Sequence, residues 1–103
     1  MGATMNEDRF GVITFTYDPG SIAAATTAEQ TVTVPGVLPG DYVSVSKPTL
    51  SAGVGIVNSR VSAANTVAVQ WVNATAAAVD PGSETYQAFV FRAEKVTPGR
   101  FNP

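Results

Sequence analysis

The most constraining feature of the chain is a long stretch in which apolar and polar residues alternate, with a single interruption. It covers residues 55–73, and the polar run Ser62–Asn65 divides it. Side chains of a β-strand point alternately to its two faces, so Val67, Val69 and Trp71 share one face of the second half. Asn tolerates the left-handed backbone that tight turns often require. The stretch therefore predicts a β-hairpin that buries one face against a second sheet.

Four further segments alternate in the same way and are separated by turn residues. Pro fixes φ and Gly accepts positive φ, so the Pro-Gly pairs between the segments mark turns. The last segment is apolar on both sides, which is typical of a central strand. Residues 21–27 are predicted to form a loop and residues 74–80 a crossing between sheets. The predicted strands cover residues 11–17, 28–34, 42–47, 54–61, 66–73 and 84–92.

Six short strands joined by Pro/Gly turns predict an all-β fold. The expected architecture is an antiparallel β-sandwich, jelly-roll-like, with irregular N- and C-terminal arms. A chain of 103 residues has room for one hydrophobic core. Residues 1–10 and 93–103 lose the alternation. We therefore expect an N-terminal arm over 1–10, a sandwich domain over 11–92 and a C-terminal arm over 93–103.

The composition argues against several classes of function. Six Lys and Arg against eight Asp and Glu leave a net charge of −2, without the basic stripe that nucleic-acid phosphates require. The chain has no His, the commonest general base and transition-metal ligand, and no Cys for a thiolate metal site. Its apolar runs are too short to cross a bilayer, and its first ten residues lack the order of a signal peptide. We expect a soluble protein, made in the cytoplasm, that is not an enzyme and binds no cofactor, metal, nucleic acid or membrane.

Acidic and aromatic residues that could carry chemistry have structural explanations. Asp18, Asp41 and Asp80 are possible acid–base groups, but each lies in a Pro/Gly turn, where Asp is favoured because its side chain hydrogen-bonds to the backbone. Trp71 could stack on a sugar or a base, yet its place between valines on a strand favours the core. We interpret all four as structural residues.

The weakly charged surface leaves two interpretations open. Charged residues make up 14% of the chain, below the roughly 25% usual for soluble domains. Such a surface is either simply coated with hydroxyl groups or covered by partners in an assembly. Arg60 and Arg92 pose the same question, because each lies on a predicted strand. Each is either solvated or salt-bridged to Glu29 or Glu84, or it forms a subunit contact.

Five short runs of residues carry a resemblance to a known family. They are Tyr-Asp-Pro-Gly-Ser-Ile-Ala-Ala at 17–24, Glu-Gln-Thr-Val-Thr-Val-Pro-Gly at 29–36, Gly-Asp-Tyr-Val-x-Val at 40–45, Val-Ser-Ala-Ala-Asn-Thr-Val at 61–67 and Asn-x-Thr at 73–75. Together they resemble a widespread family of small structural proteins and modules of tailed bacteriophages. The resemblance covers residues 11–92, and the stand-alone members are similar to capsid decoration, or cement, proteins.

This resemblance implies a role without catalysis. Cement proteins are commonly β-sandwich or jelly-roll trimers seated on the phage head. A homotrimer that binds the major capsid protein where shell subunits meet, and hence a location on the capsid surface of the virion, is therefore expected. Related modules also occur in fibre proteins, so a module of a head or tail fibre involved in host attachment is the alternative. No catalytic residue is carried over.

The two arms extend this expectation to particular side chains. Terminal segments are ordered when something ties them down, and a neighbouring subunit is one such anchor. Each arm contains a Phe that can bury apolar area and an Arg that can pair with a carboxylate. Candidate residues for subunit or capsid contacts are Arg9, Phe10, Arg60, Arg92, Arg100 and Phe101.

Overall fold

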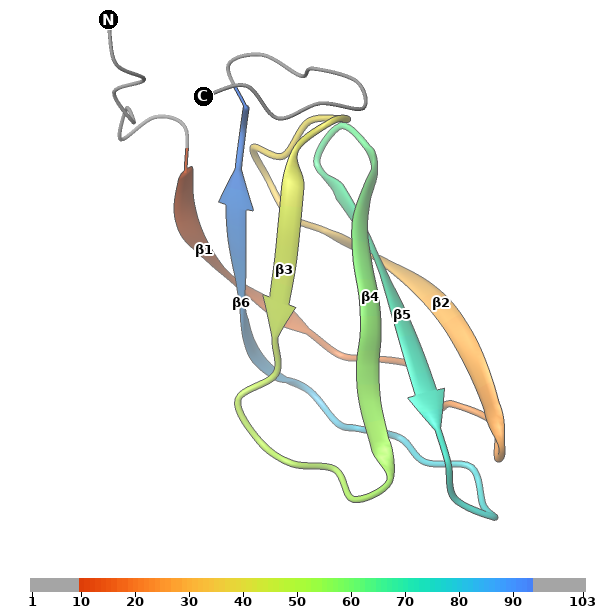
Figure 1. Ribbon diagram of the computed structural model, residues 1–103. Coiled ribbons are helices and arrows are strands. Elements are labelled where there is room, and N and C mark those ends of the chain that lie inside the picture. The colour runs from red at the N-terminus through yellow and green to blue at the C-terminus, as the bar shows by residue number, and fades with distance from the viewer. Residues whose placement is uncertain (1–9, 94–103) are drawn as a thin grey trace, which may run out of the picture.

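The computed structural model describes residues 10–93 and contains six strands and no helix within that range. The strands are β1 (Phe10–Tyr17), β2 (Thr26–Thr33), β3 (Tyr42–Ser46), β4 (Val54–Ala63), β5 (Thr66–Asn73) and β6 (Glu84–Phe91). They form two three-stranded antiparallel sheets with the orders β1-β6-β3 and β2-β5-β4 (Figure 1). The all-β prediction is confirmed, and the two sheets are consistent with a β-sandwich.

Each predicted strand is present, and its ends agree with the prediction to within two residues. β1 begins at Phe10, which we expected in the N-terminal arm, and β2 begins at Thr26 rather than Ala28. The other residues of the N-terminal arm, and all but Ala93 of the C-terminal arm, lie outside the described residues. β6 is a central strand, as predicted, because it pairs with β1 on one side and β3 on the other.

Aromatic rings from both sheets form the centre of the core. Tyr17 and Tyr86 of the first sheet lie 5.1 Å apart between ring centroids, and Tyr17 lies 6.3 Å from Trp71 of the second. Trp71 is fully buried, which confirms its predicted role in the core. The polar atoms of buried Trp and Tyr usually find a hydrogen-bond partner. Trp71 Nε1 donates a hydrogen bond to Tyr17 Oη at 3.1 Å, and the Tyr17 hydroxyl donates to Gln30 Oε1 at 2.8 Å.

Asn73, at the end of β5, holds the crossing from β5 to β6. Its side chain is buried, and Nδ2 donates to the carbonyl oxygens of Ile22 and Ala77 at 3.0 and 2.9 Å. Its Oδ1 accepts from the amide and the hydroxyl of Thr75 at 2.8 and 2.7 Å. A polar group that is buried without such partners costs folding free energy. The predicted crossing is thus confirmed, and the Asn-x-Thr run has a structural role.

The β4–β5 hairpin turns at Ala64 and Asn65. Asn65 has a φ of 60°, the left-handed conformation anticipated for it. Its Oδ1 accepts a hydrogen bond from the Gly36 amide at 2.8 Å, which ties the hairpin tip to the segment that follows β2. The turn is shorter than predicted because β4 continues to Ala63, with register shifts between Ile56 and Asn58 and between Val61 and Ala63.

An ion pair crosses the outer face of the sheet β2-β5-β4. Arg60 on β4 donates two hydrogen bonds of 2.9 Å to the carboxylate of Glu29 on β2. Ala68 on the intervening strand β5 pairs with Arg60 and is almost fully buried. Because Ala is small, the two long side chains can meet above it. The salt-bridge alternative for Arg60 is therefore confirmed.

Candidate interaction surface

Among the described residues, no charged side chain lies on the outer face of the sheet β1-β6-β3. Alternation places Phe15, Tyr17, Tyr86 and Val90 in the core, so the residues between them face away from it. We call this outer surface the aromatic face. It consists of Phe10, Val12, Thr14 and Thr16 on β1, Thr85, Gln87, Phe89 and Phe91 on β6, and Tyr42, Ser44 and Ser46 on β3.

Large apolar side chains gather at one end of the aromatic face. Phe10 pairs with Phe91 and Val12 with Phe89, while Tyr42 pairs with Phe91 from the other side. The rings of Phe10 and Phe89 lie 6.3 Å apart. The exposed fractions are 42% for Phe10, 61% for Val12, 62% for Tyr42 and 41% for Phe89. A contiguous exposed apolar patch of this kind is typical of a binding surface.

The outer face of the second sheet differs in chemistry. It presents the Arg60–Glu29 ion pair together with exposed threonines of β2, such as Thr27 and Thr31. Charges of this kind keep water bound, because their desolvation is costly. The two outer faces therefore differ, and the aromatic face is the one that a partner can cover at low cost.

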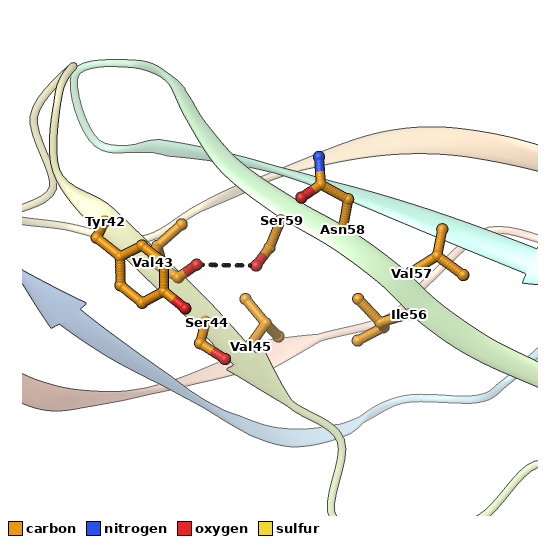
Figure 2. A pocket seen from close by; sticks show the side chains of 8 residues that line it. All are labelled: Tyr42, Val43, Ser44, Val45, Ile56, Val57, Asn58 and Ser59. Atoms are coloured by element: carbon orange, nitrogen blue, oxygen red, sulfur yellow. Dashed lines mark hydrogen bonds between the residues drawn. The ribbon is translucent and has the colours of Figure 1, made fainter. Parts of the chain in front are cut away.

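A shallow groove of about 250 Å³ adjoins the aromatic face between β3 and β4. It is lined by residues 42–45 of β3 and residues 56–59 of β4, with Val45 and Ile56 between the two strands (Figure 2). The Ser59 hydroxyl donates to the carbonyl of Val43 at 3.1 Å and joins the strands there. Small-molecule sites span roughly 300–1,000 Å³. The groove suits one side chain of a partner better than a free ligand, and Tyr42 belongs to both surfaces.

Arg92, which follows the last residue of β6, forms an intramolecular ion pair with Asp41. Its Nε and Nη2 donate to the Asp41 carboxylate at 2.8 and 2.7 Å, and Nη2 also donates to the Gly36 carbonyl at 3.0 Å. This guanidinium, helped by the Leu38 amide, holds the pKa of Asp41 below its ordinary value. Arg92 thus pairs with Asp41 rather than with the expected Glu29 or Glu84.

The acidic residues in the described part of the chain lie in loops and turns or form ion pairs. Asp41 accepts from the Leu38 amide and Asp80 from the Gly82 amide, which confirms that these two are turn residues. Asp18 follows β1 directly and is exposed. Glu84, which we considered as a partner for arginine, instead accepts from Lys47 Nζ at 2.7 Å. Within residues 10–93 no three acidic side chains gather in a group able to hold a metal ion.

The structure separates the interface candidates predicted from the sequence. Phe10 lies on the aromatic face, whereas Arg60 lies on the opposite sheet and Arg92 beside the turn at Asp41. Arg9, Arg100 and Phe101 lie outside the described residues.

Sequence reasoning missed Val12, Tyr42 and Phe89 as surface residues. The available signal was the alternation itself, because Val12 and Phe89 fall opposite to the buried residues of their strands. The apolar residues on both sides of β6 predict a central strand that is buried on both faces. β6 is central, yet Phe89 is exposed.

In the described part of the chain, no helix is long and apolar enough to cross a membrane. Comparisons of the chain with protein-family models, with curated proteins and with solved structures found no match.

Proposed function

We propose that this protein is a non-enzymatic capsid decoration protein of a tailed bacteriophage, and that it binds the outer surface of the major capsid protein shell through the aromatic face. The observation that carries the proposal is the exposure of Phe10, Val12, Tyr42 and Phe89 on a face to which the described strands contribute no charge. The five runs that resemble phage structural proteins support the phage assignment. The jelly-roll-like description, the two arms and the virion location belong to the same proposal.

The size of the apolar patch fits a weak contact made many times. Aromatic side chains bury about 150–250 Å² each, so the exposed fractions leave an apolar area on the order of 300–400 Å² in all. At about 25 cal/mol per Å², covering it contributes roughly 8–10 kcal/mol before the cost of association, which is of similar size. A single copy therefore binds modestly. Many copies stabilise a shell together by mass action, as decoration requires.

The copy number in the virion tests the role. A decoration protein is expected in hundreds of copies per particle, which a stained gel of purified virions measures. Tens of copies or fewer would instead indicate the fibre module with a role in host attachment. Absence from the mature particle would overturn both roles and leave the architecture unchanged.

Variants of the two outer faces test the surface. Val12→Lys places a charge within the apolar patch, and we expect it to lower the occupancy of shells mixed with the purified protein. Thr31→Lys adds the same charge to the exposed face of β2 on the opposite sheet and should leave occupancy unchanged. Equal effects of the two variants would contradict binding through the aromatic face.

The arms require a separate experiment because nearly all of their residues lie outside the described range. The proposal holds that Arg9, Phe10, Arg100 and Phe101 contact a neighbouring subunit. Deletion of residues 93–103 is then expected to reduce occupancy. Unchanged occupancy would remove the C-terminal arm from the proposal without affecting the aromatic face.

A further inference from the structure

Each sheet has two edge strands, and three of these four edges carry features that discourage pairing with another chain. The edges are β1 and β3 in one sheet and β2 and β4 in the other. An edge strand presents unpaired amide and carbonyl groups, and proteins protect such edges with charge, short length, bulges or a covering segment. β2 carries Glu29, and β4 carries Arg60 and two register shifts. β3 has five residues and is tied to β4 through Ser59.

Among the described residues, β1 has none of these protections. It is eight residues long, Phe-Gly-Val-Ile-Thr-Phe-Thr-Tyr, without a charge or a proline. Its register with β6 runs without a shift from Phe10 to Tyr17. Among the described residues, β1 pairs with β6 alone, and no other backbone hydrogen bond reaches it. Within the part of the chain that the structure describes, β1 is therefore the edge that is open for pairing.

The hydrogen-bonding direction of β1 follows from the ladder across its sheet. The Val43 carbonyl of β3 accepts from Ser59 of β4, so the backbone groups of Val43 point away from β6. In an antiparallel pair, two directly opposed residues either exchange both backbone bonds or both point away from each other, so Val90, the partner of Val43, directs its backbone groups to β1. Val90 pairs with Gly11, so Gly11 and every second residue after it bond to β6. The amides of Val12, Thr14 and Thr16 then face the open edge.

We infer that β1 is the site at which two copies of this chain associate, through antiparallel pairing of β1 with β1 across a two-fold axis. The paired strands are identical, so the unpaired donors and acceptors of one copy match those of the other. Neither strand carries a charge that would repel its twin. An axis perpendicular to the sheet keeps outward residues beside outward residues, and the two sheets join in the order β3-β6-β1-β1-β6-β3. The two aromatic faces become one continuous surface.

The inference is independent of the proposed function, because the test uses only the purified full-length chain. Sedimentation or light scattering should give twice the monomer mass of 10.6 kDa at high concentration, with dissociation on dilution. Amide hydrogen exchange should show the Val12, Thr14 and Thr16 amides protected in the dimer and unprotected in the monomer. Protection that persists in the monomer would mean that another part of the same chain covers the edge, and would overturn the inference.

Two substitutions at Thr14 separate pairing from folding. Thr14→Pro removes an amide that faces the open edge and makes no bond to β6, so the fold should persist while pairing is blocked. Thr14→Lys places like charges near each other where the β1 strands of the two copies pair. Gln87→Lys is the matched control, because Gln87 pairs with Thr14 on the same face but lies on the central strand β6. We expect each Thr14 variant to raise the dimer dissociation constant at least about tenfold, a loss of about 1.4 kcal/mol, with little change for Gln87→Lys.

Other outcomes contradict the inference. A mass of three copies, as the resemblance to cement proteins implies, would show that another surface mediates association. A monomer at every concentration would show that the open edge remains unpaired. A dimer that tolerates both Thr14 variants, each verified as folded by circular dichroism, would place the contact away from β1.

Discussion

Asn73 is the side chain on which the crossing between the sheets depends most. Its Nδ2 donates hydrogen bonds to two carbonyl oxygens, and its Oδ1 accepts from the amide and the hydroxyl of Thr75. Asn73→Ala removes these four hydrogen bonds and leaves the Thr75 amide without its acceptor. The Ile22 carbonyl still accepts from the Val79 amide, and the Ala77 carbonyl from the Thr75 hydroxyl. We expect the substitution to lower the free energy of unfolding by about 2–4 kcal/mol, measured by urea denaturation. Asn58→Ala, at an exposed position of β4, should change it by less than about 0.5 kcal/mol. Similar losses at the two positions would contradict this account.

The two tyrosines of the core should respond differently to loss of their hydroxyl groups. Tyr17 accepts from Trp71 and donates to Gln30, whereas the buried Tyr86 hydroxyl has no hydrogen-bond partner among residues 10–93. Tyr17→Phe orphans the Trp71 N–H, so we expect a loss of about 1–3 kcal/mol in the free energy of unfolding. Tyr86→Phe removes an unsatisfied group and should be neutral or stabilising by up to about 1 kcal/mol. A larger loss for Tyr86→Phe than for Tyr17→Phe would show that the Tyr86 hydroxyl has a partner.

Tyr86 also predicts how the fold responds to alkali. Burial raises its pKa from 10.0 to about 12, because the phenolate is disfavoured in the core. The folded protein then holds this proton more tightly than the unfolded chain does. The resulting stability is complete below pH 10 and is lost as the pH rises toward about 12. Tyr86→Phe should make the alkaline decline in the free energy of unfolding shallower, and an unchanged slope would contradict the assignment.

Close packing of the β3–β4 loop against the crossing after β5 depends on Gly53. This glycine has a φ of 77°, and an added Cβ would collide with Cγ2 of Thr75. Gly40 has a φ of 93° with open space around it, so Gly40→Ala measures the backbone cost alone, about 1–2 kcal/mol. Gly53→Ala should cost more in the free energy of unfolding. Thr75→Ser removes the colliding methyl group and keeps the hydroxyl, so it should restore part of that excess in the double variant. An additive double variant would contradict the collision.

Alternation along the chain was sufficient to predict the strands but not their partners. Each strand shows its period of two in a local run such as 11–17, whereas its position in a sheet depends on contacts distant in sequence, such as Gly11 with Val90. The ion pairs show the same limit. Glu29 was a foreseen partner for Arg60, but Asp41 reaches Arg92 only because the turn at Leu38–Asp41 lies beside the end of β6.

The surface was harder to predict than the core for a physical reason. Alternation shows that an apolar residue such as Phe89 lies on the face opposite to the buried residues of its strand, but it does not show whether a second layer covers that face. Phe89 and Trp71 both sit within alternating strands, yet Phe89 is exposed and Trp71 is fully buried. What distinguishes them is a second layer that covers one side of β6 and leaves the other open. The aromatic face therefore became apparent only once the sheets were assembled.

The molecule as a whole should be insensitive to pH across the neutral range and sensitive to acid. The sequence has no His, which is the side chain that most commonly titrates in the neutral pH range. By contrast, Arg92 lowers the pKa of Asp41, Arg60 that of Glu29 and Lys47 that of Glu84. Stability from these carboxylates is present above their ordinary pKa values, 3.8 for Asp and 4.5 for Glu, and is lost as the pH falls through the lower values of the folded state.

We therefore expect the free energy of unfolding to be nearly constant between about pH 6 and 8 and to fall below about pH 4.5. Urea denaturation at a series of pH values measures this profile. Asp41→Asn should flatten the acid decline more than Glu29→Gln does, because the Asp41 side chain is 3% exposed and that of Glu29 is 38% exposed and screened by water. A steep change between pH 6 and 8, or a larger effect of Glu29→Gln, would show that the acid response arises elsewhere than at the Arg92–Asp41 pair.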